Sequence, residues 1–186
     1  MDIDGVVGGT DAGRVHFTEL LVALALTGLV FSATLSVFAQ GQRAYTRGAA
    51  RVESQQSARV ALDRMARELR QAGSAGSLPP IAVAETSRVV IQRDLDGDGV
   101  ASARGETVTW QLSAGVLRRN AGAGAQPIVN GVRALELSYL DADSRPTTVP
   151  AAVRAVIIAL TTAPEHPGAG GATLTKLVTE VRLRNR

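Results

Sequence analysis

The stretch HFTELLVALALTGLVFSATLSVFAQGQR, residues 16–43, carries one acidic residue near its start and no further charge before its final arginine. Residues 20–39 form an apolar run of about the ~20 residues that a helix needs to cross the hydrocarbon core of a membrane. Glu19 stands at the start of this run, where an acidic side chain is costly, because insertion scales assign one roughly +2.5 to +3.5 kcal/mol at mid-membrane. The run predicts a membrane-spanning helix in which Glu19 has a function that offsets this cost.

Two other interpretations of the apolar run fit less well. A cleaved secretory signal is usually shorter, follows a basic segment and ends at an A-x-A site, whereas this run is long and follows Asp-rich residues. A buried core helix would need more covering chain than the remainder of the 186 residues supplies. The chain has no cysteine, which excludes disulfide bonds and a thiol nucleophile.

The residues after the apolar run predict that the helix continues. Residues 43–72 contain no proline and are rich in Ala, Arg, Gln and Glu, which favour helix. Apolar residues recur at spacings of three and four and form one stripe: Ala58, Leu62, Met65, Leu69 and Ala72. Gly73 and the following SAGSLPP supply a stop signal. We expect one helix over residues 17–72, with Gly41 and Gly48 as points where it could bend. It divides the N-terminal part of the chain into a transmembrane segment (15–42), apolar all round, and an amphipathic segment (43–73).

Residues 74–186 change from helical periodicity to alternation. Six segments combine strand-forming residues with Gly, Pro, Asp or Asn boundaries, namely 88–93, 106–112, 115–120, 132–140, 154–162 and 173–185. Because no helical pattern separates them, antiparallel pairing is favoured over β-α-β units. The predicted fold class is α+β, with a long N-terminal helix packed on an antiparallel β-sheet that forms the C-terminal domain.

The orientation in the membrane can be read from the arginines beside the apolar run. Only Arg14 precedes the run, whereas Arg43, Arg47 and Arg51 follow it. The positive-inside rule would therefore place the C-terminal domain in the cytoplasm.

The sequence of the helix resembles that of a known family. Glu19 followed by LLVALALTGLV, and then QQSARVALDRMARELRQAG at residues 55–73, resembles type IV pilins and pseudopilins, and most of all the PilW-like minor pilins. In that family a prepilin peptidase cuts after a glycine and methylates the new N-terminus, with the glutamate fifth in the mature chain. Here that count starts the mature chain at Val15, after Arg14, whereas a cut after Gly13 would make the glutamate sixth. The resemblance thus implies a leader at residues 1–14.

The resemblance also implies a role for Glu19 and a set of partners. The glutamate would neutralise the N-terminal ammonium of a neighbouring subunit and set the axial register, since two charges that are costly to bury singly are tolerated together. The C-terminal domain would lie in the periplasm, against the arginine count. The implied partners are other minor and major pilin-like subunits, the prepilin peptidase and the inner membrane.

The function implied by the resemblance is structural. The protein would be a minor pilin that helps to initiate or cap a type IV pilus used in adhesion, motility or DNA uptake. The alternative is a minor pseudopilin of type II secretion, which is built in the same way. A hypothesis of another class is a membrane-anchored calcium-binding or sensor domain.

The third hypothesis rests on DLDGDG, residues 94–99, which matches the opening of a calcium loop. An EF-hand would place a bidentate acid at its twelfth position, which is Gly105 here, and Glu106 comes one residue later. The flanks are strand-like, so we expect either an Asp/Gly-rich hairpin turn or a calcium-binding hairpin. The candidate calcium ligands are Asp94, Asp96, Asp98 and Glu106.

Neither catalysis nor nucleic-acid binding is predicted. The chain has two histidines, and neither stands in a pattern that defines a catalytic triad. Its formal charge is +3, and aromatic residues, 3% of the chain, are too few to alternate with the basic ones as a stacking surface for single strands would require. Apart from calcium, no cofactor is expected.

Overall fold

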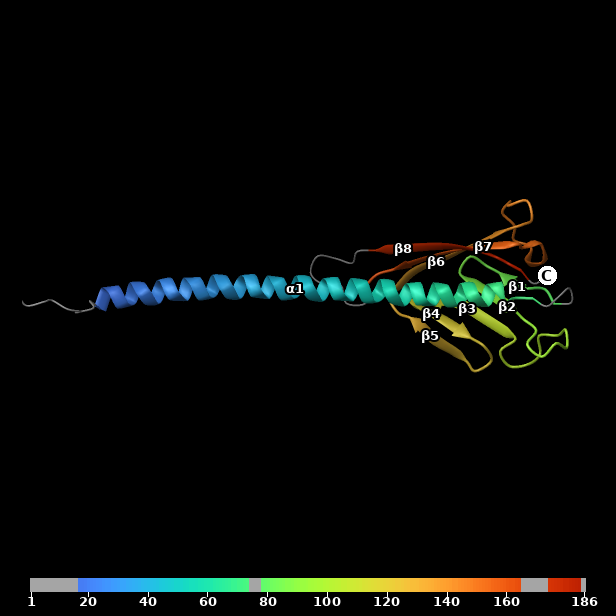
Figure 1. The fold of residues 1–186 in the computed structure, drawn as a ribbon, viewed down its shortest axis with the longest axis horizontal. Helices are drawn as coiled ribbons and strands as arrows, with labels where there is room; N and C mark the ends of the chain where they lie inside the picture. The colour runs from blue at the N-terminus through green and yellow to red at the C-terminus, as the bar shows by residue number, and fades with distance from the viewer. Residues whose placement is uncertain (1–16, 74–77, 165–173, 185–186) are drawn as a thin grey trace, which may run out of the picture. The chain divides into compact units, whose positions relative to one another are not determined.

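The protein has an α+β fold, as the sequence predicts (Figure 1). The computed structural model describes residues 17–73, 78–164 and 174–184. Within these residues, one helix is followed by eight strands and a short 3-10 turn: α1 (Phe17–Arg70), β1 (Ile81–Ala84), β2 (Arg88–Gln92), β3 (Thr107–Ser113), β4 (Val116–Asn120), β5 (Ala125–Val129), β6 (Val132–Leu140), η1 (Pro150–Ala152), β7 (Ala155–Thr162) and β8 (Thr175–Arg182).

The strands form two antiparallel sheets. The first has the order β1-β2-β3-β4-β5 and the second the order β6-β7-β8, so each sheet is a meander of consecutive strands. Six of the strands lie at the predicted segments, whereas β1 and β5 are additional. Helix α1 is continuous through Gly41 and Gly48, the two points where the sequence allows a bend.

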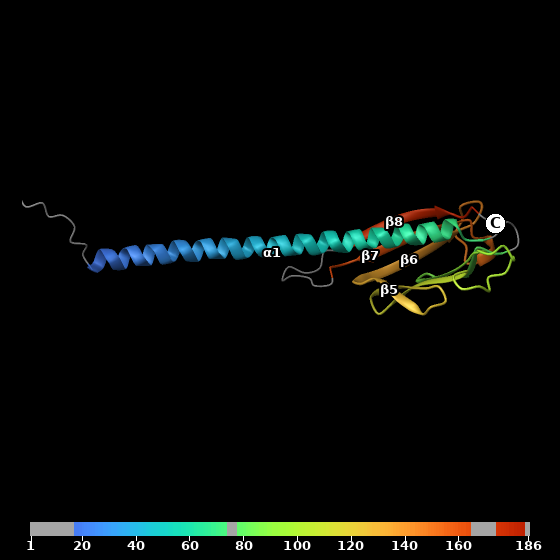
Figure 2. The same ribbon diagram turned by 60° about the horizontal axis from the view of Figure 1, so that its bottom comes forward.

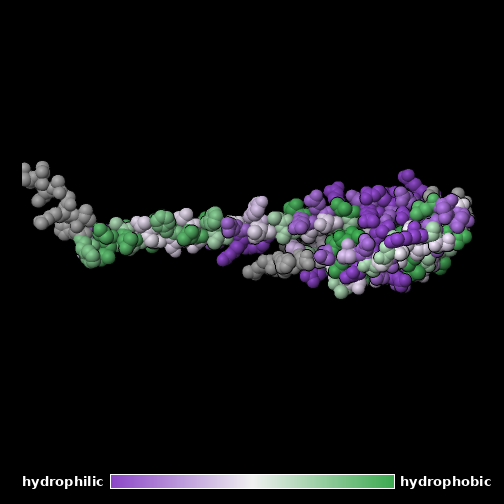
Figure 3. All heavy atoms as spheres, turned by 90° about the horizontal axis from the view of Figure 1, so that it is seen from below, coloured by the Kyte–Doolittle hydropathy of each residue, from purple (hydrophilic) through white to green (hydrophobic). Residues whose placement is uncertain are grey.

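The chain divides into two compact units, Met1–Tyr45 and Thr46–Arg186. Within the first, the described residues belong to α1, which is long and apolar enough to cross a membrane, with a mean hydropathy of 2.2 over its most apolar window. None of that window is buried inside the chain, and Figure 3 shows mostly hydrophobic side chains along it. The hydroxyls of Thr27, Thr34 and Ser36 donate hydrogen bonds to backbone carbonyls four residues earlier, at 2.7–2.9 Å. Within the helix, these bonds give the hydroxyl groups the hydrogen-bond partners that a hydrocarbon environment lacks.

The second unit is built around the C-terminal half of α1, which lies along the strands in both ribbon views (Figure 2). The predicted stripe is buried in full: Ala58, Leu62, Met65, Leu69 and Ala72 are all less than 7% exposed. These residues share one hydrophobic cluster with the inward side chains of both sheets, among them Trp110, Leu117, Ile158 and Leu160. The amphipathic half of α1 therefore covers the sheets, which is the packing that its periodicity predicts.

Candidate functional site

Glu19 lies in the first turn of α1, where the positive end of the helix dipole favours an acidic side chain. The side chains around it are exposed, including Phe17 (76%) and Leu20 (57%). The geometry therefore combines a carboxylate and a long apolar surface at the start of one helix. The proposed cleavage region, Gly13, Arg14 and Val15, lies outside the described residues.

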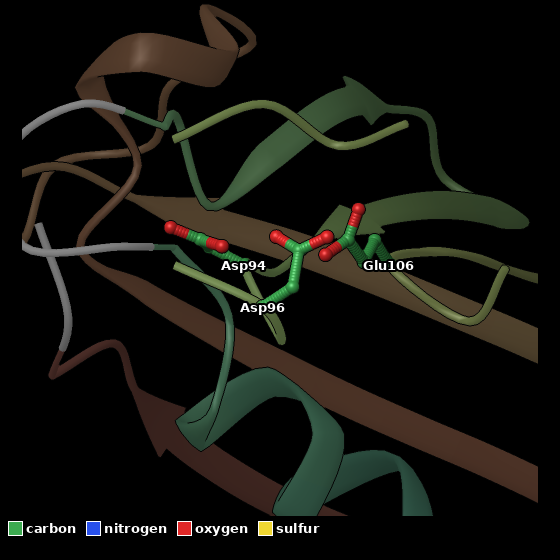
Figure 4. A group of neighbouring side chains, drawn as sticks. All are labelled: Asp94, Asp96 and Glu106. Atoms are coloured by element: carbon green, nitrogen blue, oxygen red, sulfur yellow. The ribbon is translucent and has the colours of Figure 1, made fainter. Parts of the chain in front are cut away.

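The predicted calcium ligands lie in the loop that joins β2 to β3. Asp94, Asp96 and Glu106 each place a carboxylate oxygen within 4.8 Å of the others, and Figure 4 shows the Asp96 carboxylate between the other two. The backbone N–H of Arg93 donates to the carbonyl of Glu106 at 2.9 Å, next to the last β2–β3 pair, and this brings Glu106 to the loop. The fourth predicted ligand, Asp98, is not part of this group.

The aspartates shape the loop by accepting backbone hydrogen bonds. The Asp94 carboxylate accepts the N–H groups of Gly97 at 2.6 Å and Gly99 at 3.1 Å. Both glycines have positive φ angles, 86° and 80°, which other residues rarely adopt. Asp98 accepts the N–H of Val100 at 2.8 Å, in the manner of an Asx turn. The DLDGDG pattern therefore encodes a turn whether or not a cation binds there.

Glu106 is fully buried and holds the far side of the loop. Its two carboxylate oxygens accept the backbone N–H groups of Leu95 at 3.0 Å and Ala103 at 2.7 Å. These bonds stabilise the charged form and lower the pKa of Glu106 despite desolvation. The sequence offers Glu106 as a ligand one residue after the twelfth position of an EF-hand loop. In the structure, the pairing of β2 with β3 determines its position.

Asp96 has the opposite electrostatic balance. The N–H of Asp98 donates to Asp96 and lowers its pKa, but partial desolvation and the charges of Asp98, Glu106 and Asp94 together outweigh that bond, so the pKa is raised. Carboxylate oxygens are the ligands that calcium prefers, and each accepts more than one interaction. The group of Asp94, Asp96 and Glu106 thus has the donor chemistry for a hard cation, which would relieve the mutual repulsion of the three charges.

A second polar cluster, which sequence analysis missed, connects α1 to the first sheet. Glu68 is 7% exposed and accepts a hydrogen bond from Nε1 of Trp110 at 2.7 Å. Arg119 on β4 donates from Nε to Glu68 Oε1 at 2.8 Å, and its Nη2 lies 2.8 Å from the same oxygen. Arg64 lies one turn away at 3.7 Å. The i,i+4 spacing of Arg64 and Glu68 does predict their ion pair, but no signal in the sequence indicates the contacts to Trp110 and Arg119.

A shallow pocket of about 370 Å³ lies beside α1 within the second unit. Its lining residues are Ala50, Glu53, Ser54, Ser57, Ile128, Val129, Asn130 and Ala163. Among the described residues that line the pocket, Glu53 is the one ionisable group, so these residues do not supply a paired acid and base. That the protein is not an enzyme stays a prediction.

Comparison with known proteins gives no assignment: no protein-family model matches the chain, and no curated protein is significantly similar to it.

Proposed function

We propose that the protein is a minor pilin, a structural subunit that helps to initiate or cap a type IV pilus. The observation that carries the proposal is the continuity of α1 from Glu19 in its first turn to the buried stripe, whose last member within the helix is Leu69. One helix thus combines an anchor for the membrane with a spine for the C-terminal domain. A subunit that leaves the membrane to join a filament needs this combination, because the same helix must be soluble in lipid and pack against neighbours.

In this proposal Glu19 neutralises the N-terminal ammonium of an adjacent subunit. A lone carboxylate in an apolar filament core would be costly, as would a lone ammonium, and their mutual attraction offsets part of the cost of burying each. The pairing also selects one axial offset between neighbouring helices. Such use of a buried charge to fix register is its best-attested role.

The proposed location is the inner membrane, with the C-terminal domain in the periplasm before assembly. The partners are the prepilin peptidase and other minor and major pilin-like subunits. A minor pseudopilin of type II secretion would have the same architecture, and the identity of the co-purifying subunits distinguishes the two. The three arginines after the apolar run favour the opposite orientation by the positive-inside rule. The test of the proposal therefore asks whether the prepilin peptidase removes the leader.

The test is mass spectrometry of the N-terminus after co-expression with a prepilin peptidase. We expect loss of the leader and a methylated terminus at Val15, or at Arg14 if the enzyme requires a preceding glycine. Co-expression with an inactive peptidase is the control and should leave the leader in place. An unprocessed chain with the active enzyme would argue against a pilin and in favour of a simple membrane anchor.

A further inference from the structure

Every charged side chain on α1 between Glu19 and Glu53 is positive. Residues 20–52 contain three charged side chains, Arg43, Arg47 and Arg51, and no acidic residue lies between Glu19 and Glu53. All three arginines are exposed on α1. They follow one another at intervals of four residues, the spacing that places helical side chains on one face. We call these three residues the arginine row.

The arginine row begins where the apolar run ends. At ~1.5 Å per residue, Arg43 lies roughly 6 Å and Arg47 roughly 12 Å along the helix from Ala39, the last residue of the apolar run. The polar headgroup layer of a bilayer is about 5–8 Å thick on each side. Side chains on a helix lean toward its N-terminus, which here is the direction of the apolar run. Long arginine side chains from the first part of the row can therefore reach that layer, and Figure 3 shows hydrophilic side chains beginning where the apolar part of the helix ends.

We propose that the arginine row binds the phosphate groups of anionic phospholipids at the membrane surface. A guanidinium presents a planar fork of donors that matches a phosphate, and it stays charged at every relevant pH. A surface rich in anionic lipid also attracts all three charges at once. Tyr45, 78% exposed, lies between the first two arginines in sequence and is of the residue type enriched in this layer. The proposal depends on the membrane helix and is independent of whether the protein is a pilin.

The test compares lipid retention by the full chain and two triple variants. Each protein is reconstituted in nanodiscs of mixed phosphatidylglycerol and phosphatidylcholine, transferred to mild detergent, and analysed for the lipids that stay bound. The first variant is Arg43→Gln/Arg47→Gln/Arg51→Gln. The matched control is Arg59→Gln/Arg67→Gln/Arg70→Gln, which removes the same charge from exposed positions later in the same helix. Circular dichroism checks that all three proteins remain equally helical.

We expect the unmodified chain to be enriched in phosphatidylglycerol. The enrichment should fall about fivefold on removal of Arg43 or Arg47, and by less on removal of Arg51, which lies farther from the apolar run. The control variant should match the unmodified chain, and high salt should weaken the enrichment of both. Each single substitution in the row should lower the phosphatidylglycerol enrichment by less than the triple variant does. The single variants therefore test the proposal even if the triple variant inserts poorly into the membrane. Equal enrichment in all three proteins, or equal loss in both variants, would overturn the proposal.

A final arm separates the membrane surface from a site for free phosphate. Inorganic phosphate at millimolar concentration should leave the lipid enrichment unchanged, because a single small anion does not reproduce the charged surface. Displacement of the lipid by inorganic phosphate would assign the row to a soluble phosphate ligand and overturn the membrane assignment.

Discussion

The carboxylate of Glu68 on α1 accepts a hydrogen bond from the indole nitrogen of Trp110 on β3 at 2.7 Å. Both residues are buried, and Arg119 on the neighbouring strand β4 completes the group with a charge-assisted contact to the same carboxylate. Hydrophobic burial is non-directional, so it fixes the axial position of the helix less sharply than a directional hydrogen bond does. A buried carboxylate with directional partners on two strands specifies one position, because in any other position the charges would be buried unpaired.

Replacing Glu68 by alanine should lower the free energy of unfolding by about 3 kcal/mol, since it leaves the Arg119 charge and the Trp110 N–H without their partner. Glu68→Gln should cost less, because an amide oxygen can still accept from the indole. Trp110 is the one tryptophan in the chain, so its fluorescence reports unfolding of the full chain in detergent during denaturant titration.

Arg64→Gln is the matched control for this cluster. Arg64 contacts the same carboxylate, but at 3.7 Å and from a side chain that is 45% exposed, so its loss should change stability by less than about 1 kcal/mol. A cost for Arg64→Gln equal to that of Glu68→Ala would mean that the helix-surface pair, and not the contacts to the sheet, holds Glu68 in place.

The contrast between the helix and this cluster shows what the sequence could predict. The stripe from Ala58 to Ala72 was predictable because helical periodicity is a local signal. The Glu68 cluster was not, because its partners Trp110 and Arg119 are 42 and 51 residues away in the chain. Strand β5 was missed because Pro127 lowers the strand signal, although an edge strand tolerates proline.

The Asp loop shows a different limit. Counting along an EF-hand spacing placed Glu106 one residue too late for a ligand. The structure brings it to the loop because the residues at the ends of β2 and β3 pair across the hairpin, so position across the strands matters more than position along the chain. Conversely, Asp98 fits the sequence motif but lies outside the three-carboxylate group.

Glu106→Gln should destabilise the protein in a pH-dependent way. The backbone N–H groups of Leu95 and Ala103 hold the pKa of Glu106 below its usual value in the folded state. Its contribution to stability is therefore present above the pKa of the unfolded chain and is lost as the pH falls through the lower, folded-state pKa. Melting temperatures of the variant and the unmodified chain should differ at pH 7 and converge in acid. Glu136→Gln, at an exposed side chain, is the control and should show little difference at either pH; a constant gap for Glu106→Gln would contradict the assignment.

The calcium hypothesis can be tested by comparing Asp96 with Asp98. If the hairpin binds calcium through the three grouped carboxylates, millimolar calcium should raise the melting temperature relative to chelator, by the linkage between binding and stability. Asp96→Ala should abolish that increase, whereas Asp98→Ala should leave it in place. Magnesium should substitute poorly, because it requires tighter octahedral geometry.

Two other outcomes of the calcium comparison would give the loop a different role or a different set of ligands. Unchanged melting of the unmodified chain in calcium would identify DLDGDG as a hairpin turn alone. Loss of the calcium effect in Asp98→Ala as well would restore the four-ligand set that the sequence predicts, and would mean that the loop rearranges when it binds the cation.

Glu19→Ala separates insertion into the membrane from assembly. The substitution removes a carboxylate from the apolar end of α1, so membrane extraction should show insertion that is unchanged or improved. Incorporation beside other pilin-like subunits should fall sharply, because the terminal ammonium of the neighbour would be buried without its counter-charge. Crosslinking of co-expressed subunits measures this incorporation. Glu53→Ala is the control, since it removes a carboxylate from the same helix beyond the apolar run and should leave assembly intact. Normal assembly of Glu19→Ala would rule out the pairing and leave the carboxylate as a residue at the headgroup boundary with no role in register.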